Sequence, residues 1–246
     1  MKRALKITLY VLAFLLFAGG MGVLLVLTDQ EKKRIDCKAI QVEILGECPL
    51  TTEEEIHDKL ERNFHDIVGQ RLYNLDLGHI EYVLSNDISI LDAQAWVSAD
   101  GILHIEICQR EPVLKVLDSN GKGYYADDKG VVFPLSKHGD IDVPVIICDY
   151  HNIISEGWIL QVLSLMEKIG KSSTLKDRVT GYSVQKNGDF ILHTACESVI
   201  FGDFKDISRK MAYIDRYYAR IAPLEREYKS VNVKYDKHII CRKKGI

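Results

Sequence analysis

An uncharged apolar run, Ile7–Leu27, constrains this chain more than any other stretch. No Lys, Arg, Asp or Glu lies between Lys6 and Asp29. At a helical rise of about 1.5 Å per residue, such a run spans ~30 Å, which matches the hydrocarbon core of a bilayer. A buried core helix of this length rarely lacks a polar stripe. We therefore predict a transmembrane helix over residues 7–28.

A cleaved signal peptide is the main alternative for the same run. Signal peptides have an apolar region of about 7–15 residues that ends at a small-x-small cleavage site. Here the run is longer, bulky residues occupy the expected cleavage zone from Val23 to Leu27, and the small residues lie inside the run. The first cysteine, Cys37, lies well beyond the run, which argues against a lipoprotein. These features favour an uncleaved anchor.

The number of flanking positive charges does not orient this anchor. Three basic residues precede the run within residues 1–6, and three follow it within residues 32–34. A short N-terminal tail is readily kept inside, whereas a long following domain is translocated largely regardless of its charge. We predict that residues 1–6 are cytoplasmic, that residues 29–38 form a spacer, and that the remaining chain lies outside the cytoplasm.

Composition limits the rest of the chain. Its 246 residues leave enough length after the anchor for one large or two small domains, and 47% of all residues are hydrophobic. A net charge of −3 gives no support to nucleic-acid binding. The six cysteines are widely spaced and form no CxxC motif, which excludes a zinc ribbon. Buried thiols and at least one disulfide both remain compatible with this spacing.

Residues 39–110 have the pattern of a small α+β module. Ala39–Leu45 alternates like a half-buried strand. Thr51 with Glu54, or Thr52 with Glu55, forms a capping box for a following helix. A second helix begins at Asp76, and two strands follow it, joined by a turn at Asp100-Gly101. The predicted order is strand, helix, helix, strand, strand, with Ile88–Val97 and Ile102–Cys108 as the last two strands and a bulge allowed in the first of them.

Residues 111–246 predict a mixed β-sheet domain with flanking helices. Short strands precede a helix that Ser155 caps and Gly170 ends. A three-stranded meander over residues 179–201 follows, and then an amphipathic helix that starts near Ile207 and ends at Pro223. The last two predicted strands are Val231–Tyr235 and His238–Arg242. The whole chain is thus predicted to be α+β, behind a single N-terminal transmembrane helix.

The sequence contains no catalytic signature. GxSxG, HExxH and phosphate-binding glycine loops are all absent, and the eight histidines are scattered. Asp127-Asp128 precedes Gly130, where turn chemistry explains the two acids better than an acid pair or a cation site. We predict no catalytic, metal or cofactor site and no small-molecule substrate.

Four short motifs follow one another along the chain: Arg110-Glu111-Pro112, the segment from Tyr124 to Pro134, Val199-Ile200-Phe201-Gly202 followed by Lys210, and Val231–Tyr235. In this order they resemble motifs of the bacterial cell-division family FtsQ/DivIB. Arg110-Glu111-Pro112 matches the link that joins the two periplasmic domains of that family. The segment from Tyr124 to Pro134 matches its tyrosine–aspartate–glycine hairpin, in a form similar to Bacteroidetes-like members. Val199-Ile200-Phe201-Gly202 followed by Lys210 resembles its strand–glycine–helix step, and Val231–Tyr235 resembles its penultimate strand. The resemblance covers the whole chain and implies a POTRA-type domain over residues 39–110, followed by a β domain over residues 111–246.

The resemblance implies a non-catalytic scaffold of the divisome. Such a protein is a single-pass protein of the inner membrane, with a cytoplasmic N-terminus and a periplasmic bulk. It holds FtsB/DivIC-type and FtsL-type bitopic partners and other divisome proteins at the division septum, and helps control septal peptidoglycan synthesis. The alternative is a POTRA-bearing periplasmic chaperone for outer-membrane protein assembly or secretion, but such proteins normally continue into a barrel of many strands.

The predicted partner-binding surface is the final hairpin. A last strand at His238–Arg242 leaves an open sheet edge, and another chain can extend such an edge by strand addition. Ile239 and Cys241 would face one side of this strand, and His238, Ile240 and Arg242 the other. An aromatic contact from Tyr235 and an ion pair from Lys234 would add specificity. The candidate residues are Lys234, Tyr235, His238, Ile239, Ile240 and Cys241. The competing interpretation places Tyr235 in the core and has Lys237 and Lys243 protecting the edge.

Overall fold

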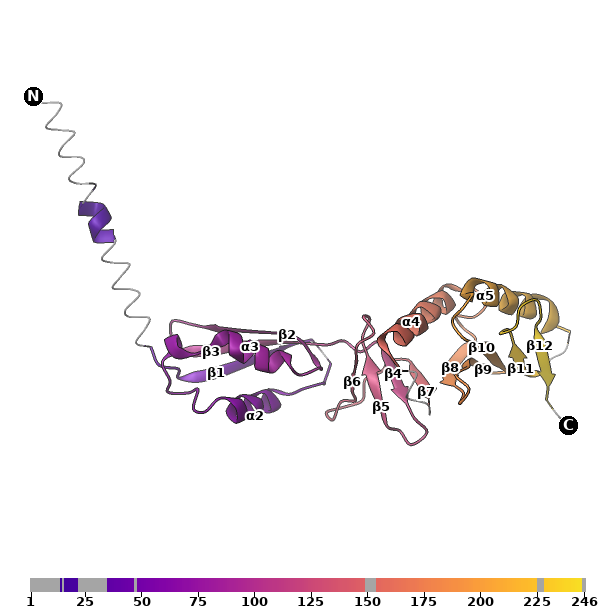
Figure 1. Cartoon of the computed structure of the whole chain (residues 1–246), viewed down its shortest axis with the longest axis horizontal. Helices are drawn as coiled ribbons and strands as arrows, with labels where there is room; N and C mark the ends of the chain where they lie inside the picture. Colours follow the sequence, from indigo (N-terminus) through magenta and orange to yellow (C-terminus); the bar gives the residue numbers. More distant parts are fainter. Residues whose placement is uncertain are drawn as a thin grey trace, which may run out of the picture. The chain divides into compact units, whose positions relative to one another are not determined.

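The computed structural model describes residues 14, 16–21, 35–46, 48–148, 154–224 and 228–244 (Figure 1). Most of the predicted membrane span and residues 29–34 of the predicted spacer lie outside these residues. Within the span, residues 14 and 16–21 are described, and they are helical. Among the residues that the structure describes, no helix has both the length and the apolar character needed to cross a membrane.

The fold is mixed α+β, with two separate sheets in two compact units. The first unit extends to Gln109 but excludes residues 48–50. The second unit contains residues 48–50 and the chain from Arg110 onward. Leu50 belongs to the second unit because it packs with the buried rings of Tyr125 and Phe133.

The first unit contains a three-stranded sheet with two α-helices. In chain order its elements are β1 (Ala39–Leu45), α2 (Glu53–Asn63), the short 3-10 helix η1 (Leu72–Asn74), α3 (Leu77–Ser85), β2 (Ile90–Val97) and β3 (Ile102–Gln109). The sheet order is β1-β3-β2, with β1 parallel and β2 antiparallel to β3. This is the predicted order of strands and α-helices.

Local capping and turn chemistry explain where these elements begin. Thr52 is the residue that caps α2, since its hydroxyl accepts a hydrogen bond from the Glu55 N–H at 3.3 Å. Asp76 caps α3 by accepting from the His79 N–H at 3.0 Å. Gly101 in the β2–β3 turn has φ of +100°, a conformation that favours glycine. A register shift near the start of β2 confirms the predicted bulge.

The second unit is built on a nine-stranded sheet. Its strands are β4 (Leu114–Leu117), β5 (Gly123–Ala126), β6 (Val132–Pro134), β7 (Val145–Cys148), β8 (Val179–Val184), β9 (Phe190–Thr194), β10 (Ser198–Gly202), β11 (Tyr228–Asn232) and β12 (Ile240–Lys243). Their order is β12-β11-β10-β9-β8-β7-β4-β5-β6. Two helices, α4 (Glu156–Lys171) and α5 (Ile207–Arg216), pack against this sheet through one apolar core (Figure 1).

Helix α4 extends beyond its predicted end, whereas the helical segment that begins with α5 ends at Ile221, just before the predicted end at Pro223. Ser155 caps α4 as predicted, but Gly170 lies inside the helix and Ser172 is its C-cap. The helix therefore does not end at a left-handed glycine, as the prediction assumed, but continues through Gly170 to Lys171. Helix α5 continues into a π-helical turn, Tyr217–Ile221, which places Tyr217 in the core.

The two final strands are displaced from their predicted positions. β11 ends at Asn232 instead of Tyr235, and β12 begins at Ile240 instead of His238. The side chain of Asn232 accepts a hydrogen bond from the Lys234 N–H at 3.0 Å, an Asx turn that draws the chain out of the strand. Lys237 then turns the chain back with φ of +62°. Alternation alone does not reveal this early turn, because Val233 stays buried beyond the strand end.

Candidate functional site: an exposed strand edge

β12 is the end strand of the nine-stranded sheet. Of the described strands it pairs with β11 alone, antiparallel, in a register that places Cys241 opposite Val231 and Ile240 opposite Asn232. An end strand presents backbone N–H and C=O groups on its outer side, which can pair with another chain. The strand is only four residues long, so an added strand would pair over a short distance.

The side chains of this segment alternate as predicted. Ile239 and Cys241 are half-buried and pack against the large core. His238, Ile240 and Arg242 are exposed, and Ile240 has 52% of its surface accessible. One set of side chains therefore closes the core, while the other set faces solvent. His238 and Ile239 precede the strand and do not belong to it.

Tyr235 is also exposed, with 49% of its surface accessible. This excludes the interpretation in which Tyr235 is an ordinary core residue. The Lys234 ammonium lies 5.9 Å from the centroid of its ring, within range of a cation–π contact. Tyr235 thus lies in the turn between the last two strands, where a large aromatic surface is accessible.

Lys234 is engaged within its own chain. Its Nζ atom donates to both carboxylate oxygens of Asp189, at 2.9 and 3.0 Å, and Asp189 is itself buried. Hydrogen bonding to this carboxylate raises the pKa of Lys234. The predicted pairing of Lys234 with an acidic residue of a partner is therefore revised, because an internal carboxylate already takes that place.

A second set of contacts holds the β11–β12 turn against α5. Arg209 pairs with Asp236 at 2.7 Å, and the Tyr213 hydroxyl accepts from the Lys237 N–H at 2.9 Å. Arg209 and Tyr213 are one helical turn apart on α5, and both contact the turn from the same helix. Sequence reasoning did not find this clamp, since its members lie 24 and 27 positions apart along the chain.

Gly202 lies where the Lys234 stem crosses the end of β10. A Cβ atom at this position would come within 3.0 Å of the Lys234 side chain, and the backbone has φ of +80°. Glycine is thus required twice here, by the left-handed conformation and by the close approach. The Gly202 motif and the Lys234 ion pair therefore belong to one arrangement.

The remaining candidate acid site is structural. Asp127 is buried, pairs with Arg110 at 2.8 Å, and accepts hydrogen bonds from the N–H groups of Lys129 and Val131. It organises the turn before Gly130, as the sequence predicted. Within the described part of the chain, no group of three or more His, Cys, Asp or Glu side chains is placed to hold a metal ion.

Comparison with known proteins identifies the family. A search of curated proteins finds no significant match to this chain. The sequence model of the family described as "FtsQ/DivIB, C-terminal related" matches residues 111–242, more than half of the chain and nearly all of the second unit. This match includes the first three residues of β12, Ile240 to Arg242. The chain therefore belongs to the FtsQ/DivIB C-terminal-related family, whose members have a role in bacterial cell division.

Proposed function

We propose that this protein is a non-catalytic, membrane-anchored scaffold of the divisome. In this role it holds FtsB/DivIC-type and FtsL-type bitopic partners at the septum and helps control septal peptidoglycan synthesis. Family membership supports the role in division. The uncharged run Ile7–Leu27 supports a single anchor in the inner membrane, with a cytoplasmic N-terminus and a periplasmic bulk.

We further propose that the first unit is a POTRA-type domain. Its support is the order strand, helix, helix, strand, strand and the mixed three-stranded sheet with β3 in the centre. The proposed domain limits, 39–110 and 111–246, agree with the change from one compact unit to the next at Gln109 and Arg110. The separate sheets favour two independently folding domains.

The proposed mechanism of partner binding is strand addition to β12. The observation that carries it is the position of β12 at the end of the sheet, with alternate side chains exposed. Backbone pairing along β12 would supply affinity, and Ile240 and Tyr235 would supply apolar contact area. In this proposal a strand of the partner protein pairs with the outer side of β12 and extends the sheet.

Charge adds a constraint on that partner. Lys237, Arg242 and Lys244 are exposed in this part of the chain. Basic residues on an edge oppose pairing with a second basic edge, so they disfavour self-association of two copies. An incoming strand with acidic residues beside its apolar positions would be favoured, although each rim pair adds only about 0–1 kcal/mol.

Proline substitutions at neighbouring positions test strand addition. In an antiparallel strand the N–H groups of successive residues point to opposite sides, so of Ile240→Pro and Cys241→Pro only one removes an outward donor. Far-UV circular dichroism and thermal unfolding identify the variant that keeps the wild-type fold. That variant should lose capture of the purified FtsB/DivIC-type partner in a pull-down with the full-length chain in detergent.

A side-chain variant completes the test. Tyr235→Ala should stay folded and weaken capture, since an exposed aromatic anchor is lost. Tyr124→Ala is the matched control, because Tyr124 is a comparably exposed tyrosine on β5, at the other end of the sheet order. Capture of the partner at wild-type strength by both folded edge variants would place the binding site elsewhere.

A further inference from the structure

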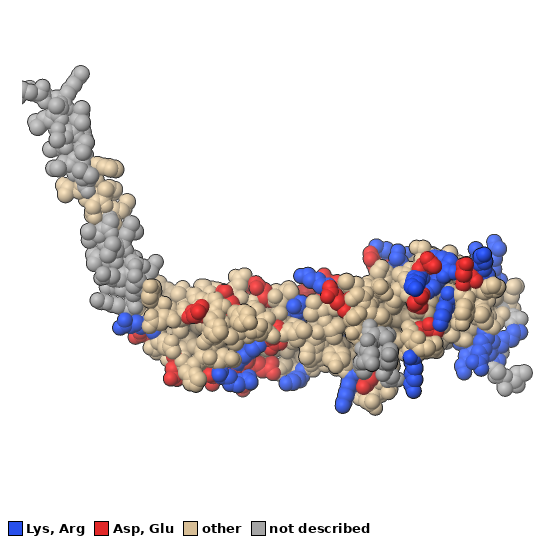
Figure 2. Space-filling model, viewed as in Figure 1, with Lys and Arg blue, Asp and Glu red and all other residues tan. Residues whose placement is uncertain are grey.

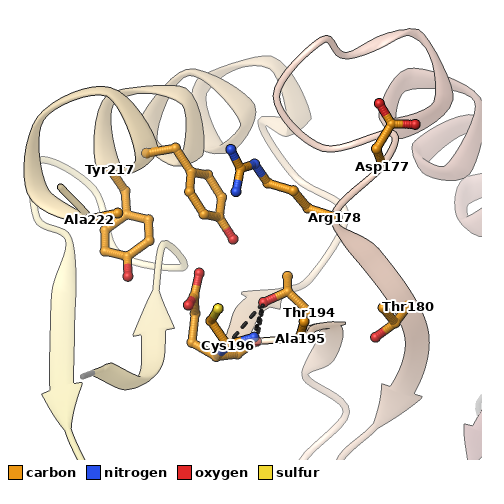
Figure 3. A pocket seen from close by; sticks show the side chains of 10 residues that line it. Asp177, Arg178, Thr180, Thr194, Ala195, Cys196, Tyr217 and Ala222 are labelled. Atoms are coloured by element: carbon orange, nitrogen blue, oxygen red, sulfur yellow. Dashed lines mark hydrogen bonds between the residues drawn. The ribbon is translucent and has the colours of Figure 1, made fainter. Parts of the chain in front are cut away.

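The cavity beneath the end of α5 is lined by polar groups that bind one another (Figure 3). The Thr194 hydroxyl donates to the Glu197 carbonyl oxygen at 2.8 Å and accepts from the Cys196 and Glu197 N–H groups at 3.3 and 3.2 Å. Burial, followed by hydrogen bonding to the Glu197 side chain, raises the pKa of Tyr218. These groups therefore stabilise the second unit and require no ligand.

A groove in the first unit, here called the β1 groove, is different because its wall is apolar and open. It has a volume of about 470 Å³ and is lined by Ile40 of β1, by the last turn of α2, and by residues 64–68, which follow that helix. Ile40 and Phe64 are half-buried, and Val68 has 54% of its surface exposed. Since Ile40 and Phe64 pack against the core of the unit, the β1 groove is a place where that core remains open to solvent.

The strand beside this groove is an end strand of its sheet. Among the described strands, β1 pairs with β3 alone. Just before β1 the chain pairs with itself, since the Cys37 N–H donates to the Gln70 carbonyl oxygen and the Gly69 N–H donates to the Cys37 carbonyl oxygen, both at 2.7 Å. The residues that precede Gly69 line the groove instead. The seven residues of β1 therefore present an open edge, to which another chain can add a strand.

The opposite edge of the same sheet is protected. In the end strand β2 the Ala95 N–H donates to the Oε1 atom of Glu81, on helix α3, at 2.8 Å. A carboxylate that occupies a backbone N–H of an end strand hinders the addition of a further strand there. Of the two edges of this sheet, the β1 edge is thus the better one for strand addition.

The side chains of β1 indicate what an added strand would contribute. Ile40, Val42 and Ile44 contact the core, and Val42 is buried whereas Ile40 and Ile44 are half-buried. Paired residues of neighbouring strands place their side chains on the same face of a sheet. A strand added to β1 would therefore direct alternate side chains toward the helices, where an apolar one would enter the groove and cover Ile40.

Charge defines the partner further. Glu61 and Asp66 belong to the lining of the groove, and Glu43 is exposed on β1. Residues 39–109 contain fourteen Asp and Glu against three Lys and Arg, and acidic side chains are visible over this unit in Figure 2. Such a surface attracts a basic segment and repels a second copy of itself.

We propose that the β1 edge and its groove bind an extended segment of another protein, in which apolar residues alternate with lysine or arginine. The segment pairs its backbone with β1 and inserts one apolar side chain into the groove. Its basic residues lie at the acidic surface around it. This site is in a different unit from the β12 edge, and it does not depend on the proposed role in division.

A photoreactive peptide tests this proposal. The probe is a seven-residue peptide, blocked at both ends, in which lysine alternates with valine and benzoylphenylalanine replaces the central valine. After irradiation with the full-length chain in detergent, mass spectrometry maps the cross-link, which should fall within residues 40–44 or 60–68. Successive N–H groups of a strand point to opposite sides, so methylation of either the lysine nitrogens or the apolar nitrogens blocks pairing with β1. One of these two methylated peptides should need about tenfold more for the same yield, and the other should not.

Two matched variants locate the site. Val68→Lys places a positive charge at the groove, so about tenfold more peptide should be needed for the same cross-link yield. Leu91→Lys changes the net charge of the unit equally at a comparably exposed position of β2, with 45% of its surface accessible, and should have a much smaller effect. Circular dichroism establishes that both variants are folded.

Four outcomes would overturn the proposal. Cross-links outside residues 40–44 and 60–68 would place the peptide elsewhere, and equal losses in Val68→Lys and Leu91→Lys would show attraction by charge alone. Undiminished cross-linking of both methylated peptides would exclude backbone pairing. A dimer of the wild-type chain in light scattering that Val68→Lys dissociates would assign the edge to a second copy of the chain instead of another protein.

Discussion

The two units distribute charge in opposite ways. Residues 39–109 contain fourteen Asp and Glu against three Lys and Arg, whereas residues 110–246 contain eighteen against twenty-two. Acidic side chains are visible over the first unit in Figure 2, while blue and red mix over the second. The units also differ in the polar side chains that they bury, among the residues that the structure describes. The first unit buries the uncharged Gln109, whereas the second unit buries four charged side chains, those of Lys115, Asp127, Asp189 and Lys210.

This difference indicates two kinds of stability. The first unit has an apolar core and an acidic surface, so its fold depends on packing and is opposed by self-repulsion. The second unit holds buried charges in pairs, among them Lys210, which is fully buried and donates to the Asp203 carboxylate and carbonyl oxygens at 2.6 Å. Its fold therefore depends on specific polar contacts as well as on packing.

The largest expected effect comes from a cavity in each core. Leu103→Ala in the first unit and Leu165→Ala in the second remove fully buried side chains, and each should destabilise its own unit by about 2–5 kcal/mol. The chain has two tryptophans, Trp96 in the first unit and Trp158 in the second. In a Trp158→Phe background the fluorescence of Trp96 reports unfolding of the first unit, and Trp96→Phe isolates the second.

These matched variants test whether the units fold independently. We expect each leucine substitution to shift the urea midpoint of its own unit and to leave the other midpoint in place. A common shift of both midpoints by either substitution would show one cooperative domain and contradict the proposed division at residues 110 and 111.

A smaller effect should follow from the buried lysine. Lys210→Ala should destabilise the second unit by about 2–4 kcal/mol, because packing and hydrogen bonds are lost together. Lys210→Met, which keeps the aliphatic stem without a buried charge, should lose less. Urea unfolding followed by Trp158 fluorescence measures both variants, and equal losses would show that the charge pair is the sole contribution of Lys210.

The same pair predicts a dependence on pH. Hydrogen bonding to Lys210 lowers the pKa of Asp203 below its ordinary 3.8. The pair therefore contributes its full stability above that pH, and the contribution is lost as the pH falls through the lowered pKa. Below pH 3.8 the wild type should lose stability faster than Lys210→Met, and parallel curves would contradict the assignment.

The smallest expected effect is a difference between the two units in how their thermal midpoints depend on salt concentration. At 0.1 M ionic strength the Debye length is about 10 Å, so repulsion between surface charges farther apart than this is largely screened. Raising sodium chloride should therefore raise the thermal midpoint of the acidic first unit by a few degrees and move that of the second less. The two single-tryptophan chains measure these midpoints, and equal shifts in both units would contradict a role for self-repulsion.

Short-range patterns determined much of this protein. Alternation and capping residues predicted the strands of the first unit and the starts of its helices, because each depends on a few neighbouring residues. Motifs between Arg110 and Tyr235 also indicated the family from sequence alone. The match of the family model over residues 111–242 confirms this prediction. The exposed alternation of Ile240 and Arg242 follows from strand geometry alone.

Only the tertiary structure decided which polar side chains pair with one another. Lys234 and Asp189 lie 45 positions apart, and Arg209 and Asp236 lie 27 apart, so no local pattern indicates either pair. Lys210 sits in a helix whose periodicity predicts its inward face but not the Asp203 oxygens that accept from it. Contacts of this kind form only when packing brings distant segments together. For the same reason sequence alone identified the edge strand but not the carboxylate that already holds Lys234.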